Sequence, residues 1–229
     1  MTYNIYHGAT LKEDFDLDYL SKVITRQNPD VVFLQEVDRY TKRSRGMDIA
    51  TELAYRTKLS ALFGTAMPFD DGQYGITILS RYPICSSKNY ILPYSKGRES
   101  RALLVANVKL GSGDTISLMC THIDQNDKNS DRPIQIKRIL NISNTIKYPK
   151  ILAGDFNMTP DAPELKFLDP YFSRNKRDDE IYTYPSDKPT IKIDYIFFAP
   201  QKNFTILNSL VPEETIGSDH RPYIVEAEL

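Results

Sequence analysis

Two polar side chains that could bind one ligand follow a short apolar run in residues 150–160, KILAGDFNMTP. Residues 151–153 predict a strand buried on both faces, and Gly154 is expected to let the chain turn. Asp155 and Asn157 come next, two residues apart, so on an extended chain they share a face. In α/β proteins, ligands are held at the carboxyl ends of strands. Since Asp and Asn beside Gly are also common turn residues, this stretch alone leaves both interpretations open.

Similar polar residues lie at the ends of other apolar runs. Glu36 follows residues 31–34. Asp194 lies between Ile193 and residues 195–198, where a carboxylate is costly to bury unless it is hydrogen-bonded or bound to a cation. For Asp194, the alternative is a structural aspartate that is only hydrogen-bonded. For Asp219 and His220, which precede the last strand, the alternative is a plain polar loop. The remaining members of the set are Asn4, His122, Asp219 and His220.

All three histidines of the chain belong to these clusters: His7, His122 and His220. Their spacing matches no zinc motif. Because most of the ligands on offer are oxygens, the expected cation is hard, Mg²⁺ or Mn²⁺. A histidine beside an aspartate suits acid–base work or the binding of a charged transition state. The sequence has neither a nucleophile elbow nor a Gly-rich P-loop, so the expected nucleophile is water.

Apolar periodicity predicts the elements that must position these residues. Three amphipathic helices and one short helix are expected to begin at Asp16, Asp48, Asp131 and Pro163. The third carries Ile134, Ile139 and Ile142. Strands are expected over residues 2–5, 31–34, 75–80, 84–90, 104–110, 115–121, 151–153, 193–198, 205–210 and 223–228.

The arrangement of these elements indicates the architecture. Alternation over residues 104–110 predicts a half-buried antiparallel strand. The order of amphipathic helix, buried strand and acidic residue occurs twice, ending at Glu36 and at Asp155, which suggests two halves of similar build facing one site. Many antiparallel strands and a helix near the start of each half predict two packed sheets with helices outside. Residues 1–229 are expected to form a single domain.

Composition narrows the class of protein. The chain has 229 residues, of which 41% are hydrophobic and 26% charged, as in ordinary globular domains. A net charge of −1 gives no overall attraction to nucleic acid or an anionic membrane. This weakens a nucleic-acid function without excluding it, because a local basic patch can bind phosphates. No run approaches the ~18 apolar residues of a membrane span, and we expect a monomer.

Other features concern the chain ends and the cysteines. Met1 and Thr2 run directly into an apparent core strand, so we expect the native N-terminus to be missing. The compartment therefore stays unknown, and a secreted, periplasmic or membrane-anchored origin is open. Cys85 and Cys120 could form at most one disulfide and fit no metal motif, and both are expected to be small buried residues.

Taken together, these motifs resemble the endonuclease/exonuclease/phosphatase superfamily of deoxyribonuclease-like, metal-dependent phosphoesterases. The matching pieces, in the order of the family, are TYNIYHG at 2–8, DVVFLQEVD at 30–38, YGITILSRYPI at 74–84, RESRALLVANV at 98–108, THID at 121–124, ILAGDFNMTPD at 151–161, KIDYIFF at 192–198 and GSDHRP at 217–222. The resemblance implies an α+β fold, a four-layer α/β/β/α sandwich of two packed mixed sheets with helices on the outer faces. The site would lie at one edge of the sheets.

The resemblance also implies roles for the metal and the water. Glu36 would be the principal ligand of Mg²⁺ or Mn²⁺, with Asn4 beside it and Asp219 near the metal. Asp155 would orient or deprotonate the attacking water, with Asn157 as its partner at the phosphate. The reaction would be an in-line attack of metal-activated water on phosphorus.

The remaining roles concern the phosphoryl oxygens. His220 would contact them, held in its tautomer by Asp194. His122 would bind another non-bridging oxygen. Arg101, or as second choice Arg98, would add a positive charge whose planar fork suits a phosphate.

Two departures from the family pattern stay unexplained. The substrate also stays open. Tyr6 stands where many members have the first of two histidines, which leaves the role of His7 undecided. Tyr74 and Tyr94 are the only candidates for the tyrosine that nucleases of the family place near the scissile phosphate. The family includes nucleases, inositol-phosphate phosphatases, sphingomyelinases and deadenylases. We expect a small or lipid-like phosphodiester or phosphomonoester as substrate, with DNA or RNA cleavage as the alternative and an inactive binding module less favoured.

Overall fold

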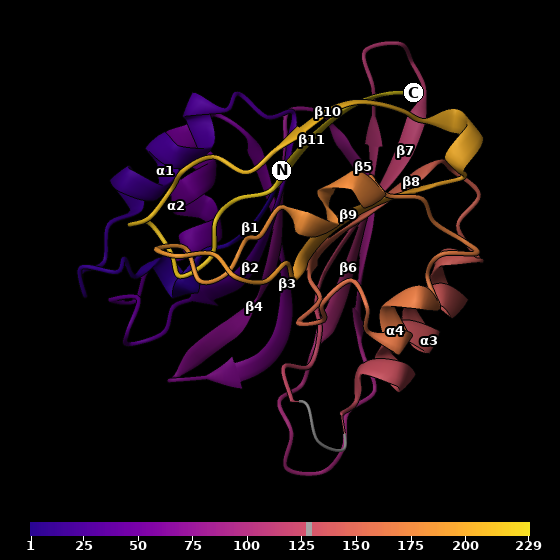
Figure 1. Ribbon diagram of the computed structural model, residues 1–229. Coiled ribbons are helices and arrows are strands. Elements are labelled where there is room, and N and C mark those ends of the chain that lie inside the picture. Colours follow the sequence, from indigo (N-terminus) through magenta and orange to yellow (C-terminus); the bar gives the residue numbers. More distant parts are fainter. Residues whose placement is uncertain (127–129) are drawn as a thin grey trace.

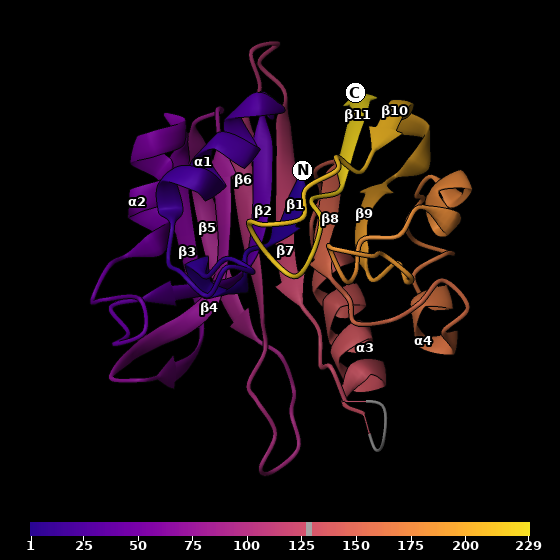
Figure 2. The same ribbon diagram turned by 60° about the vertical axis from the view of Figure 1, so that its left-hand side comes forward.

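The computed structural model describes residues 1–126 and 130–229, which form two β-sheets packed face to face between two layers of helices (Figures 1 and 2). The mixed sheets predicted from the sequence are therefore confirmed. The first sheet has the order β1-β2-β4-β3 and the second β5-β6-β7-β8-β9. A separate two-stranded ribbon, β10-β11, completes the described strands.

The first sheet and its helices come from the N-terminal part of the chain. Its strands are β1 (Thr2–Asn4), β2 (Val31–Arg39), β3 (Ser60–Phe69) and β4 (Gly72–Ser80), and its helices are α1 (Leu17–Arg26) and α2 (Ile49–Thr57). As predicted, Asp16 caps α1 by accepting a hydrogen bond from a backbone amide of its first turn, and Asp48 caps α2 in the same way. The apolar faces of both helices pack against Val32 and Leu34 of β2.

The second sheet follows. Its strands are β5 (Ile84–Ile91), β6 (Ala102–Lys109), β7 (Thr115–His122), β8 (Lys150–Asp155) and β9 (Asp194–Ala199), covered by α3 (Arg132–Ser143) and α4 (Pro163–Lys166). The last strands are β10 (Thr205–Leu210) and β11 (Ile224–Glu228), and short 3₁₀ turns lie at Tyr6–Gly8, Lys176–Glu180 and Gln201–Asn203. No helix among the described residues is long and apolar enough to cross a membrane.

The two parallel strand pairs bring the predicted site residues to one end of the sandwich. β1 runs parallel to β2, and β7 runs parallel to β8. β1, β7 and β8 end at Asn4, His122 and Asp155, and Glu36 lies at the bulge in β2. His122 pairs directly with Asp155 in the ladder between β7 and β8. Both chain termini lie at the other end of the molecule (Figure 1).

Two strand predictions need correction. β2 does not stop before Glu36 but continues to Arg39 across a bulge, where the register with β4 shifts between Leu34 and Val37. Glu36 itself has a left-handed φ of 57°, which turns its side chain out of the regular alternation. β6 is buried on both faces rather than half-buried, because Leu104 faces the other sheet while Leu103 packs under α3.

Other predictions fail for simpler reasons. β3 was not predicted at all, because its apolar residues are only half-buried and alternate weakly. Ile134 is 46% exposed, whereas Ile139 and Ile142 are buried as expected. Cys120 is buried but Cys85 is exposed, so the expectation of two buried cysteines is wrong for Cys85, and both thiols are free.

Gly154 lies inside β8 and does not turn the chain as the sequence suggested. A Cβ atom at this position would lie 1.9 Å from the carbonyl oxygen of Thr121 on β7. We expect Gly154→Ala to lower the free energy of unfolding by about 3 kcal/mol, the upper part of the range for overpacked sites. Urea unfolding measures the change. Gly111→Ala, at a turn with open space around it, is the control, and an equal effect of both variants would contradict the close approach.

Candidate active site

Asp155 is the point on which the predicted residues converge. It is the last residue of β8, and its carboxylate is 1% exposed. Its Oδ1 accepts a hydrogen bond from the backbone amide of Asn157 at 2.8 Å, and its Oδ2 accepts one from Asn4 Nδ2 at 3.1 Å. The same Oδ2 lies 3.5 Å from His122 Nε2 and 3.6 Å from His220 Nε2. Burial raises the pKa of Asp155, and the nearby charge of Asp194 adds to the rise.

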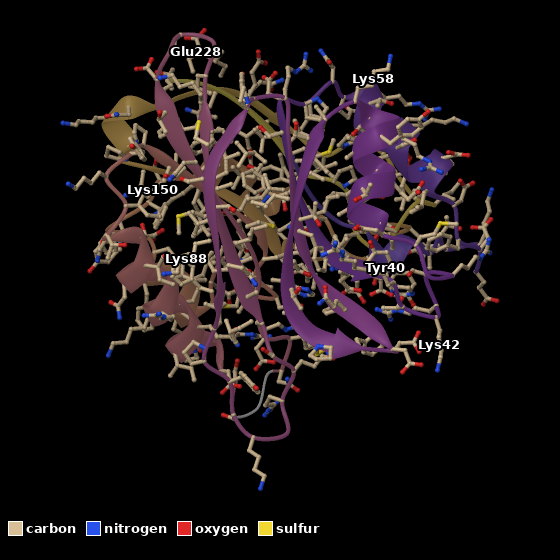
Figure 3. The ribbon with its side chains drawn as sticks, turned by 180° about the vertical axis from the view of Figure 1, so that it is seen from behind. Tyr40, Lys42, Lys58, Lys88, Lys150 and Glu228 are labelled. Atoms are coloured by element: carbon tan, nitrogen blue, oxygen red, sulfur yellow. The ribbon has the colours of Figure 1, made fainter. Side chains whose placement is uncertain are left out.

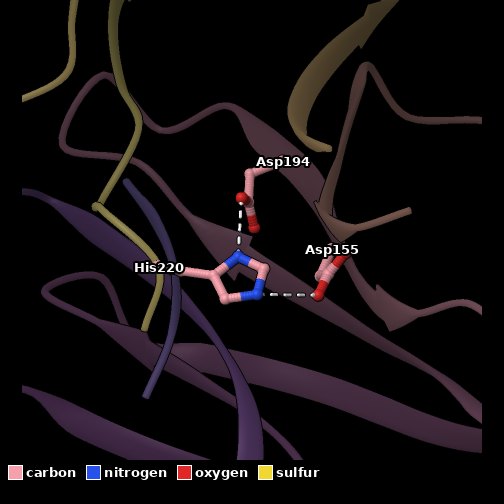
Figure 4. Close-up of side chains that lie close together, drawn as sticks. All are labelled: Asp155, Asp194 and His220. Carbon is pink, nitrogen blue, oxygen red and sulfur yellow. Dashed lines mark hydrogen bonds and ion pairs between the residues drawn. The ribbon is translucent and has the colours of Figure 1, made fainter. Parts of the chain in front are cut away.

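His220 lies between two carboxylates (Figure 4). Its Nδ1 is 2.9 Å from Asp194 Oδ2, and its Nε2 faces Asp155. Burial opposes protonation of the ring, but the carboxylates of Asp194 and Asp155 outweigh burial and raise the pKa of His220. The imidazole is therefore held as a cation with one N–H fixed on Asp194 and the other turned toward Asp155.

The loop that carries His220 is fixed by hydrogen bonds to β1 and to a second loop. Ser218 Oγ donates to the carbonyl oxygen of Asn4 at 2.7 Å and accepts a hydrogen bond from the His220 amide at 3.2 Å. Ser186 donates twice, from its amide to the carbonyl of Asp219 and from its Oγ to the carbonyl of Ser218. The polar segment GSDHRP, residues 217–222, is therefore a loop fixed by hydrogen bonds.

His122 is oriented by a buried arginine. Arg101, 2% exposed, approaches His122 Nδ1 at 3.1 Å through one guanidinium nitrogen and pairs with Glu99 at 2.9 Å through another. A guanidinium can only donate, so Nδ1 must accept and the ring proton must lie on Nε2. Burial and the charge of Arg101 lower the pKa of His122, which keeps the ring neutral.

Two hydrogen-bond donors then meet at the mouth of the site. The Nε2–H of His122 lies 3.1 Å from Nδ2 of Asn157, whose amide also donates to the carbonyl of Ile123 at 3.1 Å. Two N–H groups at this distance cannot bond each other. Asn157 has a left-handed φ of 50°, which turns its amide toward the histidine instead of along the strand. An oxygen bearing negative charge would satisfy both donors.

Glu36 and Asp219 form an acidic group beside Asp155. Asn4 Nδ2 joins the two parts, because it donates to Glu36 Oε1 at 3.2 Å as well as to Asp155. Burial would raise the pKa of Glu36, but His7, His122 and Asn4 together lower it to about 2. Burial raises the pKa of Asp219, and the charge of Glu36 raises it further.

The structure brings together most of the predicted site and separates a few members from it. Arg101 lies behind His122, so its expected contact with a phosphate stays a prediction. Arg98 is half-buried in the loop between β5 and β6. Tyr74 is buried, and burial together with the charge of Glu36 raises the pKa of its hydroxyl. Tyr94 is 50% exposed.

Sequence reasoning missed Tyr184 at the edge of the site. Its ring centroid lies 4.9 Å from that of His220. Burial, followed by the charges of Asp219 and Asp155, raises the pKa of its hydroxyl. Tyr184 is one of several aromatic residues between α4 and β9, so no signal in the sequence distinguishes it.

Lys192 is a second residue that the sequence analysis overlooked, although it opens the KIDYIFF motif. It is 1% exposed, and its Nζ lies 3.6 Å from the centroid of the Tyr223 ring. Neither Lys192 Nζ nor Asp194 Oδ1 has a hydrogen-bond partner among the described residues. Burial lowers the pKa of Lys192 to about 8 against the opposing charge of Asp194.

The buried charge of Lys192 makes a pH-dependent prediction. The folded protein binds the proton of Lys192 more weakly than the unfolded chain does. Below about pH 8 the buried charge therefore lowers the free energy of unfolding. This destabilisation decreases as the pH rises from about 8 to 10.5. We expect Lys192→Met to raise the free energy of unfolding at pH 7 by about 3 kcal/mol, at ~1.36 kcal/mol per pKa unit, with no gain above pH 10.5. Urea unfolding of both proteins across this range tests it, and a gain independent of pH would contradict it.

Comparisons with known proteins agree with this geometry. The profile of the Endonuclease/Exonuclease/phosphatase family matches residues 1–220. No curated protein matches the chain. Among solved structures, an endonuclease/exonuclease/phosphatase from Beutenbergia cavernae is 22% identical with a TM-score of 0.80, covering 100% of this chain and 70% of that one.

Two further solved structures are named as a phosphatase and as a catalytic domain. The mannosyl-6-phosphatase of Bacteroides thetaiotaomicron is 15% identical with a TM-score of 0.79, covering 100% of this chain and 98% of that one. The catalytic domain of human Nocturnin, solved with a bound sulfate, is 20% identical with a TM-score of 0.72, covering 98% of this chain and 92% of that one. At these identities the likeness shows the fold.

Proposed function

This chain belongs to the endonuclease/exonuclease/phosphatase family, whose members hydrolyse phosphoester bonds, and we propose that it is a Mg²⁺- or Mn²⁺-dependent hydrolase of a small or lipid-like phosphoester. The observation that carries the proposal is the convergence on Asp155 Oδ2 of Asn4, His122 and His220. A buried carboxylate with a raised pKa, beside a histidine cation and the N–H donors of His122 and Asn157, suits attack of water on an anionic phosphorus centre.

Each residue has a part in that reaction. Asp155 accepts the proton of the attacking water, because its raised pKa makes it a stronger base than an exposed aspartate. The N–H groups of His122 and Asn157 bind one non-bridging oxygen of the phosphoryl group. His220 donates to another oxygen through Nε2 while Asp194 holds its Nδ1–H. These donors are in place before the substrate arrives, so little reorganisation is needed as charge develops.

The acidic group at Glu36 fits a divalent cation better than the cluster around His220 does. Ligand atoms of Asp155, Asp194 and His220 lie within 4.8 Å of one another. However, both nitrogens of His220 face carboxylate oxygens and its pKa is raised, so the ring offers no lone pair to a metal. Glu36 and Asp219 repel each other, as the raised pKa of Asp219 indicates.

A cation held by Glu36 and Asp219 would relieve this repulsion and would add positive charge next to the phosphoryl oxygens. Asn4 is less well suited as a ligand, because its Oδ1 accepts a hydrogen bond from the Tyr6 amide at 3.1 Å. Its place in the metal site stays a prediction, and its two donated hydrogen bonds instead tie Glu36 to Asp155.

The substrate proposal rests on the charges around the site. The chain has a net charge of −1. In the segment that follows Glu36, Arg39, Lys42 and Arg43 pair with the carboxylates of Asp48, Asp71 and Asp38. Figure 3 shows Lys42 at the β3–β4 end of the molecule, away from Lys58. Cations already paired in this way offer little to a nucleic-acid backbone. The mannosyl-6-phosphatase with the same fold supports a small phosphomonoester as one member of the substrate class.

A substrate panel tests this choice directly. The panel contains p-nitrophenyl phosphate, its bis ester, sugar phosphates, inositol phosphates, sphingomyelin and single-stranded DNA, each with Mg²⁺ and with Mn²⁺. We expect hydrolysis of small esters to exceed that of DNA. Faster cleavage of DNA than of every small ester would favour the nuclease alternative.

Replacing Glu36 by Gln should mainly weaken metal binding. The carboxamide keeps the shape of the side chain but loses the charge, so we expect the Mg²⁺ affinity to fall by at least about tenfold, a loss typical even of outer-shell partners of a metal. The Mg²⁺ dependence of the rate and calorimetric titration both measure it. Glu52→Gln on helix α2, where Glu52 pairs with Arg56, is the matched control. An unchanged Mg²⁺ dependence would count against Glu36 as a ligand.

A further inference from the structure

The turn after β1 has a backbone that side chains normally avoid. Tyr6, His7 and Gly8 have φ values of 45°, 47° and 86°, all in the left-handed region. Gly8 suits this conformation, but for the two residues before it the Cβ atom makes it unfavourable. Unfavourable backbone of this kind is kept where it aims a functional side chain. In this turn, the side chain that it aims at the acidic group is that of His7.

His7 has a buried nitrogen that forms no hydrogen bond with the described part of the chain. Its Nδ1 has no hydrogen-bond partner among the described residues. The nearest acidic atom is Oε2 of Glu36, 3.9 Å away, too far for a hydrogen bond. The side chain is 19% exposed, and the Tyr6 ring lies beside it with 4.5 Å between centroids. The ring is therefore held with its Nδ1 edge directed toward a carboxylate.

The gap between the two atoms has the size of a cation site. Two ligands of one ion lie about 3–4 Å apart for bond lengths near ~2.1 Å. The other oxygen of Glu36, Oε1, already accepts a hydrogen bond from Asn4, which leaves Oε2 as the oxygen that faces His7. A bound ion would satisfy both the unpartnered nitrogen and the carboxylate oxygen that faces it.

We propose that His7 Nδ1 is a ligand of the divalent cation at Glu36 and the only nitrogen in a set of oxygen ligands. The proposal rests on the proposed function, in which Glu36 holds the metal. Imidazole nitrogen favours transition-metal ions, whereas an all-oxygen set suits Mg²⁺. His7 therefore makes the site prefer Mn²⁺ over Mg²⁺, and the preferred activating ion of this enzyme is Mn²⁺.

His7→Asn is the sharpest variant for this question. Asn tolerates the left-handed backbone better than most residues. Its Oδ1 is one bond from Cγ, as Nδ1 is in histidine, so the variant replaces a nitrogen ligand by an oxygen in the same place. Unfolding without metal, followed by circular dichroism, checks that the fold is kept.

The experiment measures binding of Mn²⁺ and Mg²⁺ by calorimetry and the nitrogen coupling of bound Mn²⁺ by pulsed electron paramagnetic resonance. Wild type is compared with His7→Asn and with Glu36→Gln. We expect wild-type spectra to show a directly bound histidine nitrogen that His7→Asn loses. We also expect the ratio of Mn²⁺ to Mg²⁺ affinity to fall by at least about tenfold in that variant.

The outcomes separate this proposal from the proposed function. If Glu36→Gln abolishes Mn²⁺ binding while His7→Asn keeps the wild-type affinity ratio and nitrogen coupling, the role of His7 is overturned and the metal site stands. Wild-type spectra without any bound nitrogen overturn it in the same way, whatever the variants do. If wild type binds neither ion saturably, the metal-dependent function fails and the role of His7 fails with it.

Discussion

Replacing Asp155 by Asn is expected to lower the turnover number by about 100- to 10,000-fold, the range for a positioned general base. The variant keeps the size of the side chain and an acceptor for the Asn157 amide, but it cannot take a proton from water. Steady-state hydrolysis of p-nitrophenyl esters at saturating metal measures the loss. Because binding of the substrate does not depend on this proton, KM should change much less than turnover.

Stability distinguishes this loss from unfolding. Burial raises the pKa of Asp155, so its charged form already costs stability in the folded protein. Asp155→Asn removes this cost but turns an NH2 group toward the N–H donors of Asn4 and His122, so we expect a melting temperature close to that of wild type. Asp161→Asn, at an exposed aspartate in the loop that follows β8, is the matched control and should keep wild-type turnover. A slow Asp155→Asn variant that also melts early would not support catalysis by this carboxylate.

Loss of His220 is the second large expected effect. The ring is a protonated donor aimed at the reacting group, and removal of one such donor typically costs about 100- to 1,000-fold in turnover. His220→Ala would also leave Oδ2 of Asp194 buried without its partner, which destabilises the protein. His220→Gln is therefore the better variant, since its amide can still donate to Asp194 while the cation is gone.

A double-mutant cycle with Asp194 sharpens the test of His220. If Asp194 acts only by holding the ring, Asp194→Asn should cost turnover in the wild type but add little in His220→Gln. Independent, multiplicative losses would contradict that coupling. Turnover of His220→Gln close to wild type would remove the donor role altogether.

Much of this site could be predicted from the sequence because its members end apolar strands. Asp155 and His122 each close a buried run, and parallel pairing of β7 and β8 then places them opposite each other. Asp194 was noticeable because a carboxylate inside an apolar run needs a partner, and His220 supplies it. The family and the two mixed sheets are confirmed. The roles of these residues and the single domain over residues 1–229 stay predictions.

What the sequence could not predict depends on local backbone and on contacts between distant segments. The bulge at Glu36 and the left-handed φ of Asn157 leave no trace in apolar periodicity. Arg101 lies behind His122 because β6 and β7 pair in one register, which no motif specifies. From the sequence alone, Lys192 is expected to be a solvent-exposed cation. The fold instead buries it against Tyr223.

The most direct test of the central claim is the initial rate of bis-p-nitrophenyl phosphate and p-nitrophenyl phosphate hydrolysis by wild type and Asp155→Asn, with Mg²⁺, with Mn²⁺ and with chelator. The proposed function predicts hydrolysis by wild type that needs the metal and that Asp155→Asn loses by at least about 100-fold. Hydrolysis that persists in chelator, or that Asp155→Asn carries out at the wild-type rate, would contradict it.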